Sequence, residues 1–213
     1  MTVLELRQYT MAPGRRQDFV DIFDREFVET QEALGIEVLG QFMDLDRPDR
    51  YVWIRRFPDM ERRAAALDAF YSGPVWAQHS EAANATMTEW HDVLLLKPAG
   101  AGSDLAASPA ERLPHGHRAA EGNRLAVLVW DVPPERLASF AAAAAGALPG
   151  LRAVYVTEPS ANTYPRLPIR EDASVVVAIL DGEPPADKTR LRGLAPSQVL
   201  RLAPTPRSAL RGV

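Results

Sequence analysis

The sequence contains no cysteine and only 4 histidines among its 213 residues. The absence of cysteine excludes disulfide bonds, thiolate metal sites and a cysteine nucleophile. The formal net charge is −4 and no lysine and arginine cluster forms a basic patch, so a nucleic-acid partner is not expected. No apolar run approaches membrane-spanning length and no signal-like stretch opens the chain, so we expect no membrane partner and a cytoplasmic location.

Several common catalytic signatures are also missing. The sequence has no glycine loop that would cradle phosphate, no nucleophile elbow and no recognisable Ser-His-Asp spacing. These absences give no support to nucleotide binding or to acyl-transfer chemistry by a serine triad.

The chain does contain a partial internal repeat. Residues 4–14 alternate apolar and polar side chains before a Pro-Gly step, and residues 125–134 follow a similar course to a Pro-Pro step. Alternation with a period of two predicts a strand, and the proline predicts the start of a helix. Each opening is followed by a helical pattern, two strands and a last strand, so the repeat predicts two copies of one α+β unit.

The predicted elements follow the same order in both copies. Strands are expected at residues 4–9, 36–43, 51–57 and 90–96, then at 124–130, 151–158, 174–181 and 197–202. Helices are expected between residues 14 and 35, then at 59–71, 75–83 and 134–145. Asp59 is the expected N-cap of its helix, and Gly35 the expected helix stop. In the second copy only residues 184–193 are available for the second helix. That helix is therefore expected to be eroded, that is, shorter than its counterpart in the first copy.

The order β-α-β-β-α-β is ferredoxin-like. The predicted fold class is therefore α+β, with two tandem ferredoxin-like units that form an α+β barrel. Residues 98–123 are rich in Ala, Gly, Ser and Pro without apolar periodicity, which predicts a linker. The predicted division is a first domain at 1–97, the linker at 98–123, a second, degenerate domain at 124–203 and an extended or disordered tail at 204–213.

Residues 3–97 resemble the NIPSNAP family. The residues that carry the resemblance are Glu5-Leu6-Arg7-Gln8-Tyr9, Pro13-Gly14, Gly35 with Val38-Leu39-Gly40, Trp53, Asp59-Met60-Glu61-Arg62-Arg63 and Trp76. The second half resembles the partner half of two-unit NIPSNAP-type proteins through residues 162–170. The resemblance implies a dimeric α+β barrel, in which two sheets face each other around a central space, and hence a homodimer. Barrels of this kind include cofactor-free monooxygenases, haem-dependent enzymes and stress-response proteins. Whether the barrel closes within one chain or between two stays open.

The barrel gives the alternating strands two distinct faces. Leu4 and Leu6 are expected to pack on the helices, so the intervening side chains would line the lumen. The side chains expected in the lumen are Glu5, Arg7, Tyr9, Tyr51, Trp53 and Arg55. Aromatic rings with a few polar groups suit a small planar ligand. The alternative is a filled interface in which Arg7 pairs with a carboxylate such as Glu5.

Three residues are candidates for catalysis. Arg7 would stabilise an oxyanion, and Tyr9 or His79 would move a proton. His79 follows Trp76 by three residues, so both lie on one helical face. Trp53 and Trp76 would stack on the substrate. The alternatives for His79 are haem ligation or a local hydrogen bond on the helix surface.

A long loop in the second half supplies further candidates. Asn162, Arg166 and Arg170 lie among prolines that stiffen the loop. Two arginines could hold a carboxylate or an enolate, or could bond backbone carbonyls as a structural cover. His91 is a weaker candidate, and the linker residues His115 and His117 lack the further ligands that a zinc site needs, so no metal is predicted.

The predicted function is a small cofactor-independent enzyme that acts on an aromatic or polyketide-like metabolite in the barrel lumen. Oxygenation, cyclisation and isomerisation are the reactions considered, so a cofactor-free monooxygenase or cyclase is the enzyme class. The alternative is a non-catalytic small-molecule-binding or scaffold protein that uses the barrel to dimerise.

Overall fold

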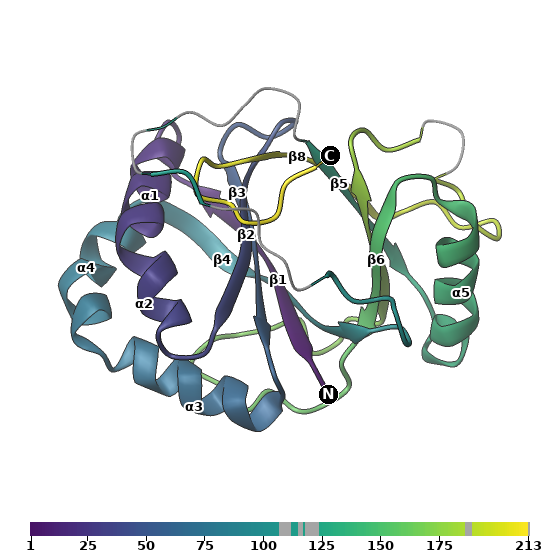
Figure 1. The fold of residues 1–213 in the computed structure, drawn as a ribbon, viewed down its shortest axis with the longest axis horizontal. Coiled ribbons are helices and arrows are strands. Elements are labelled where there is room, and N and C mark those ends of the chain that lie inside the picture. Colours follow the sequence, from purple (N-terminus) through teal and green to yellow (C-terminus); the bar gives the residue numbers. More distant parts are fainter. Residues whose placement is uncertain (107–111, 115–116, 118–123, 186–188, 213) are drawn as a thin grey trace.

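The computed structural model describes residues 1–106, 112–114, 117, 124–185 and 189–212. In these residues, antiparallel strands close into one barrel in the order β1-β3-β2-β8-β5-β7-β6-β4 (Figure 1). The strands are β1 (Val3–Met11), β2 (Glu37–Asp44), β3 (Arg50–Phe57), β4 (Met87–Pro98), β5 (Leu125–Asp131), β6 (Leu151–Thr157), β7 (Val175–Asp181) and β8 (Gln198–Pro204). The barrel thus closes within a single chain.

The helices cover the barrel unequally. They are α1 (Arg16–Ile22), the π-helical segment η1 (Phe23–Phe27), α2 (Val28–Glu32), α3 (Met60–Tyr71), α4 (Pro74–Asn84), the 3₁₀ segment η2 (Pro134–Arg136) and α5 (Leu137–Ala147). Helices α1 to α4 lie on one side of the barrel and α5 lies on the other (Figure 1). The first half therefore builds a thick helix layer and the second half a thin one.

The predicted order of strands and helices is observed, with ends that differ by a few residues. The Asp59 carboxylate accepts a hydrogen bond of 2.7 Å from the Arg62 N–H and caps α3 as predicted. Gly35 follows α2 with φ of +81°, a conformation that favours glycine. In the described residues between β7 and β8 there is no helix, only a bridge between Leu191 and Leu194.

Strand pairing joins the two halves into one closed sheet. β4 pairs with β6 through Leu96 and Thr157, and β2 pairs with β8 through Met43 and Ala203. Backbone hydrogen bonds therefore continue across both junctions, and each half completes the sheet of the other.

The hydrophobic core has three parts. Alternate residues of all eight strands meet in the lumen, where the cluster is almost wholly aliphatic and includes Leu4, Leu6, Ile54, Val127 and Val177. A second cluster lies between the first half's strands and helices α1 to α4, and it is rich in aromatic rings. A third lies between the second half's strands and α5. Barrel closure thus buries both faces of the sheet.

Parts of the segments predicted as linker and tail pack on the barrel. Leu105 lies in the lumen cluster, and its N–H donates to the Tyr155 hydroxyl at 3.0 Å. The tail packs on the barrel, because Thr205 and Ser208 are fully buried. The physical reason is that β8 pairs with only part of β2, and the tail bonds the backbone of Gln41 and Leu39 that β8 leaves unpaired.

Candidate functional site

The side chains of β1 alternate between lumen and helix layer in the opposite sense to the one expected. Leu4 and Leu6 face the lumen, whereas Tyr9 packs among the helices, and Glu5 bonds to Arg63 of α3. The predicted lumen position is therefore wrong for the whole set, namely Glu5, Arg7, Tyr9, Tyr51, Trp53 and Arg55. The reason is that the strands of the second half fill the lumen with apolar side chains. The charged side chains of β1 and β3 instead pair with each other and with Arg63 beneath the helices.

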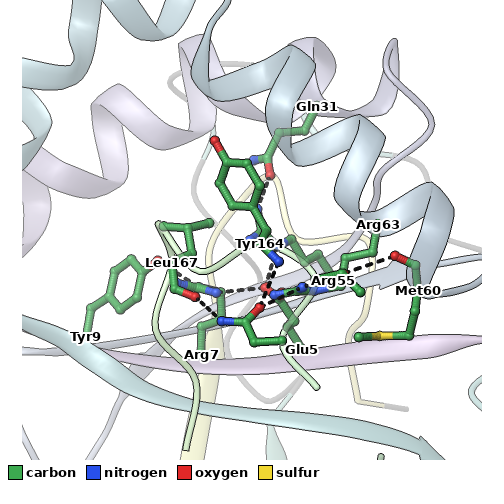
Figure 2. A network of polar contacts seen from close by, with 11 residues as sticks. Glu5, Arg7, Tyr9, Gln31, Arg55, Met60, Arg63, Tyr164 and Leu167 are labelled. Carbon is green, nitrogen blue, oxygen red and sulfur yellow. Dashed lines mark hydrogen bonds and ion pairs between the residues drawn. The ribbon is translucent and has the colours of Figure 1, made fainter. Parts of the chain in front are cut away.

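Glu5 is the centre of a buried ionic cluster. Its Oε2 accepts hydrogen bonds from Nη1 of Arg7 and Nε of Arg55, and its Oε1 accepts one from Nε of Arg63, each at 2.7 Å (Figure 2). All four side chains have 0% exposure. The pairing of Arg7 with Glu5, the alternative considered above, is confirmed, although it lies under the helices and not between two sheets.

Charge keeps this cluster ionised despite its burial. Burial by itself would raise the pKa of Glu5, but Arg55, Arg7 and Arg63 outweigh it and hold that pKa well below its usual range. Burial would lower the pKa of Arg7, but Tyr9 and Glu5 raise it further than burial lowers it. Three guanidinium groups therefore face one carboxylate, with an excess of positive charge.

Tyr9 connects the ionic cluster to the aromatic layer. Nε of Arg7 donates to the Tyr9 hydroxyl oxygen at 2.8 Å. Burial raises the pKa of Tyr9 above its ordinary value although Arg7 opposes this effect, so the phenol keeps its proton at neutral pH. Because the oxygen accepts from Arg7, the O–H hydrogen can be donated to a further acceptor.

A cavity of about 210 Å³ has Tyr9 of β1, Trp53 of β3 and residues of the helix layer in its wall. Aromatic rings form most of its wall, among them Tyr9, Phe23, Phe27, Trp53, Phe70 and Trp76. We call this cavity the aromatic pocket. The π-helical turn η1 interrupts the predicted single helix and includes both Phe23 and Phe27, and such turns are frequent at functional sites.

One residue of the pocket wall, Trp53, has a buried donor without a partner. Nε1 of Trp53 is buried and makes no hydrogen bond within the described residues. The Trp53 ring lies 4.8 Å from the Arg55 guanidinium carbon and 5.6 Å from that of Arg7. Trp53 and Tyr9 are neighbours, with ring centroids 6.0 Å apart, and both rings lie beside the arginines.

The loop between β6 and β7 closes the pocket from the second half of the chain. Tyr164, Arg166 and Leu167 line it. The loop is fastened to the ionic cluster, because Nη1 of Arg63 donates to Oδ1 of Asn162 at 3.1 Å and to the Thr163 hydroxyl at 3.2 Å. Figure 2 shows Tyr164 and Leu167 beside the arginines. The two halves thus meet at the pocket as well as in the barrel.

Three predicted site residues lie outside this arrangement. His79 does not line the pocket; its Nε2 lies 3.5 Å from Oε2 of Glu26 on η1, the local contact considered above. Nη1 of Arg170 lies 3.6 Å from Oδ1 of Asp92 and outside the pocket wall. Tyr51 is buried beneath Phe19 and Phe23, whose ring centroids lie 5.0 and 5.6 Å from its own.

The remaining predicted residues come together. Tyr9, Trp53, Trp76 and Arg166 line the aromatic pocket. Glu5, Arg7 and Asn162 stand behind it in one chain of hydrogen bonds through Arg63.

Sequence reasoning missed Arg63 and Gln31. Arg63 precedes Leu67 and Phe70 by four and seven residues, so the buried stripe of α3 includes it, and that period is the signal that could have found it. Gln31 Oε1 accepts from Nη1 of Arg55 at 3.0 Å, and no sequence pattern marks this contact.

No group of three or more metal-ligating side chains occurs in the part of the chain that the structure describes. His115 lies outside the described residues. Among the described helices, none has the length and apolar character needed to cross a membrane.

Solved structures resemble the chain at low identity. A proposed monooxygenase from Lactobacillus acidophilus is 14% identical, with a TM-score of 0.57, over 99% of this chain and 97% of its own. A second, from Fusobacterium nucleatum, is 10% identical, with a TM-score of 0.58, over 100% and 96%. These likenesses show the fold of the whole chain.

The first half has likenesses of its own. A NIPSNAP family protein of unknown function from Agrobacterium tumefaciens is 20% identical, with a TM-score of 0.43, over 46% of this chain and 87% of its own. No curated protein matches the chain. The family model described as NIPSNAP matches residues 4–100. Over residues 4–100 the chain is thus similar to the NIPSNAP family.

Proposed function

We propose that the chain binds a small aromatic or polyketide-like metabolite in the aromatic pocket. The observation that carries the proposal is a cavity walled by aromatic rings, whose wall includes Tyr9, hydrogen-bonded to Arg7, and Trp53, whose buried N–H has no partner among the described residues. Rings stack on a planar ligand, and a few donors orient it. The volume of about 210 Å³ is below the usual range for drug-sized ligands, which favours one or two rings.

The tryptophans make binding measurable. Three of the 4 tryptophans, Trp53, Trp76 and Trp90, line the pocket, and Trp130 lies in the second half's cluster. Titration with 2-naphthol, a planar two-ring probe, is expected to change the fluorescence. Trp76→Ala should weaken binding at least fivefold, because it removes a ring from the wall. The control Trp130→Phe should keep the affinity and the signal. A parent protein that binds no planar aromatic probe would contradict the proposal.

Catalysis is the second candidate, and the Arg7 to Tyr9 hydrogen bond of 2.8 Å favours it. A phenol that is hydrogen-bonded to a guanidinium is a good donor to a carbonyl oxygen, and such a donor stabilises the enolate on the path of a cyclisation, an isomerisation or an oxygenation. Against it, the described residues that form the pocket wall include no carboxylate and no histidine to act as base. Binding is therefore better supported than turnover.

The test of catalysis uses an enolisable aromatic ketone. If Tyr9 acts on a bound carbonyl, the protein should speed deuterium exchange at the α-carbon of 2-tetralone, followed by NMR. Tyr9→Phe should lose that acceleration while it still binds 2-naphthol. Equal exchange rates with and without protein would leave a binding protein as the conclusion.

We propose further that the two halves are tandem ferredoxin-like units, residues 1–97 and 124–203, joined by 98–123. The barrel supports this division, because the order β4-β1-β3-β2 in the first half is repeated as β8-β5-β7-β6 in the second. A cytoplasmic homodimer is also proposed. Since the barrel closes within the chain, such a dimer would form through outer surfaces, and light scattering would test it.

A further inference from the structure

The ionic cluster behind the aromatic pocket is unbalanced. Arg7, Arg55 and Arg63 share the single carboxylate of Glu5. In each of these arginines, Nη2 is buried and has no hydrogen-bond partner among the described residues. The cluster thus has two formal positive charges in excess and unused donors, in a place that water reaches poorly. Uncompensated buried charge is costly, so such a site favours a complementary anion.

The excess charge lies beside two residues of the pocket wall. The Arg7 guanidinium carbon is 5.4 Å from the Tyr9 ring and 5.6 Å from the Trp53 ring, and Arg7 also donates to the Tyr9 hydroxyl. Tyr9 and Trp53 line the pocket. An anionic oxygen that accepted from these two donors would lie within a few ångströms of the arginines, where a low dielectric strengthens their attraction.

We propose that the pocket selects an aromatic oxyanion, with a carboxylate, enolate or phenolate oxygen held by the Tyr9 hydroxyl and the Trp53 N–H and balanced by the arginine cluster. The inference rests on the proposed function and adds the charge class of the ligand. Arg7 acts through Tyr9 and is thus a positioning residue, while Tyr9 and Trp53 contact the ligand. A neutral ligand of the same shape would leave the excess charge unbalanced.

The test compares probes of one shape and different charge. Calorimetry with 2-naphthoate, methyl 2-naphthoate and 2-naphthol should give the naphthoate at least tenfold tighter binding than the ester. Raising the pH through the ionisation of 2-naphthol should tighten its binding, which distinguishes phenolate from carboxylate recognition. In Arg7→Gln the ratio of naphthoate to ester affinity should fall at least fivefold, with ester binding kept. The surface control Arg201→Gln should keep the ratio of the parent.

Folding is controlled by circular dichroism. If Arg7→Gln does not fold, Tyr9→Phe serves as the second variant, and it should reduce the ratio at least threefold. Equal binding of naphthoate and ester by the parent would overturn the anion inference and leave the proposed function standing. Failure of all three probes would overturn both. Loss of the preference in Arg166→Gln but not in Arg7→Gln would place the recognition at the exposed mouth of the pocket and overturn the role of the cluster.

Discussion

Two glutamates, one in each half of the chain, are surrounded by arginines in opposite environments. Glu5 accepts from Arg7, Arg55 and Arg63, and all four side chains are completely buried. Glu183 accepts from Arg124 and Arg201, and its side chain is 47% exposed. Glutamate–arginine pairing therefore forms a buried cluster next to a pocket in one half and a solvent-exposed contact in the other.

The surrounding layers differ in the same way. Beneath α1 to α4 the first half buries aromatic rings and charges together, whereas beneath α5 the second half's cluster is apolar and packs around Trp130 and Phe140. Two halves with the same strand order thus have different contents. The strand order therefore does not decide whether a sheet has a functional site. The side chains between the sheet and its helices decide it.

The largest effect is expected when the buried ionic cluster loses its carboxylate. Glu5→Gln leaves three buried arginines without a carboxylate, and we expect the free energy of unfolding to fall by roughly 3–5 kcal/mol in urea denaturation. Because the pKa of Glu5 is depressed in the folded state, its contribution is present above the unfolded pKa and is lost as the pH falls through and below that value. A variant as stable as the parent at pH 7 would show that the cluster is not structural.

The next prediction distinguishes core packing in the second half from ligand binding in the first. Phe140→Ala removes a fully buried ring from the second half's cluster and should cost roughly 3–4 kcal/mol of stability. It should leave the affinity for 2-naphthol unchanged, since Phe140 is far from the pocket wall in the chain's other half. Its matched partner Phe27→Ala should lower both stability and affinity. If Phe140→Ala weakened binding as much as Phe27→Ala, the two layers would not be functionally distinct.

A second buried carboxylate in the first half gives an effect of the opposite sign. Burial raises the pKa of Asp24 to about 6, and Thr205 and Arg207 only partly oppose this. The folded state therefore binds a proton more tightly than the unfolded state, so stability decreases as the pH rises from about 4 to 6. At about 1.4 kcal/mol per pKa unit the cost above pH 6 is about 3 kcal/mol. Asp24→Asn should be more stable than the parent at pH 7.5, and the gain should disappear at pH 4.

The smallest effect is expected at the surface counterpart of Glu5. Glu183→Gln should leave the urea midpoint within error of the parent, because solvated ion pairs contribute little to stability and are screened by salt. The comparison with Glu5→Gln is matched in chemistry and differs in burial. A drop as large as that of Glu5→Gln would mean that the number of arginine contacts, and not burial, sets the cost.

Local patterns predicted most of the fold. The alternation in β1, the N-cap at Asp59 and the glycine at position 35 each depend on neighbours within a few residues, and each was found where expected. The candidate site was predicted less well. Tyr9, Trp53 and Trp76 share a pocket, but Arg63 was missed, because its contact with Glu5 joins residues 58 positions apart. His79 was a catalytic candidate from its residue type and its spacing from Trp76, and the sequence does not show that it lies outside the pocket wall.

The sequence by itself determined which side chains of each strand share a face, because successive residues of a strand point to opposite sides. Only the tertiary structure decided what each face meets. The lumen became apolar because strands from both halves close around it, and the charged face became the wall of a pocket because α1 to α4 and the loop at Asn162 cover it. Periodicity is a local property of the chain, whereas burial depends on segments that lie about a hundred residues away, such as Asn162 from Arg63.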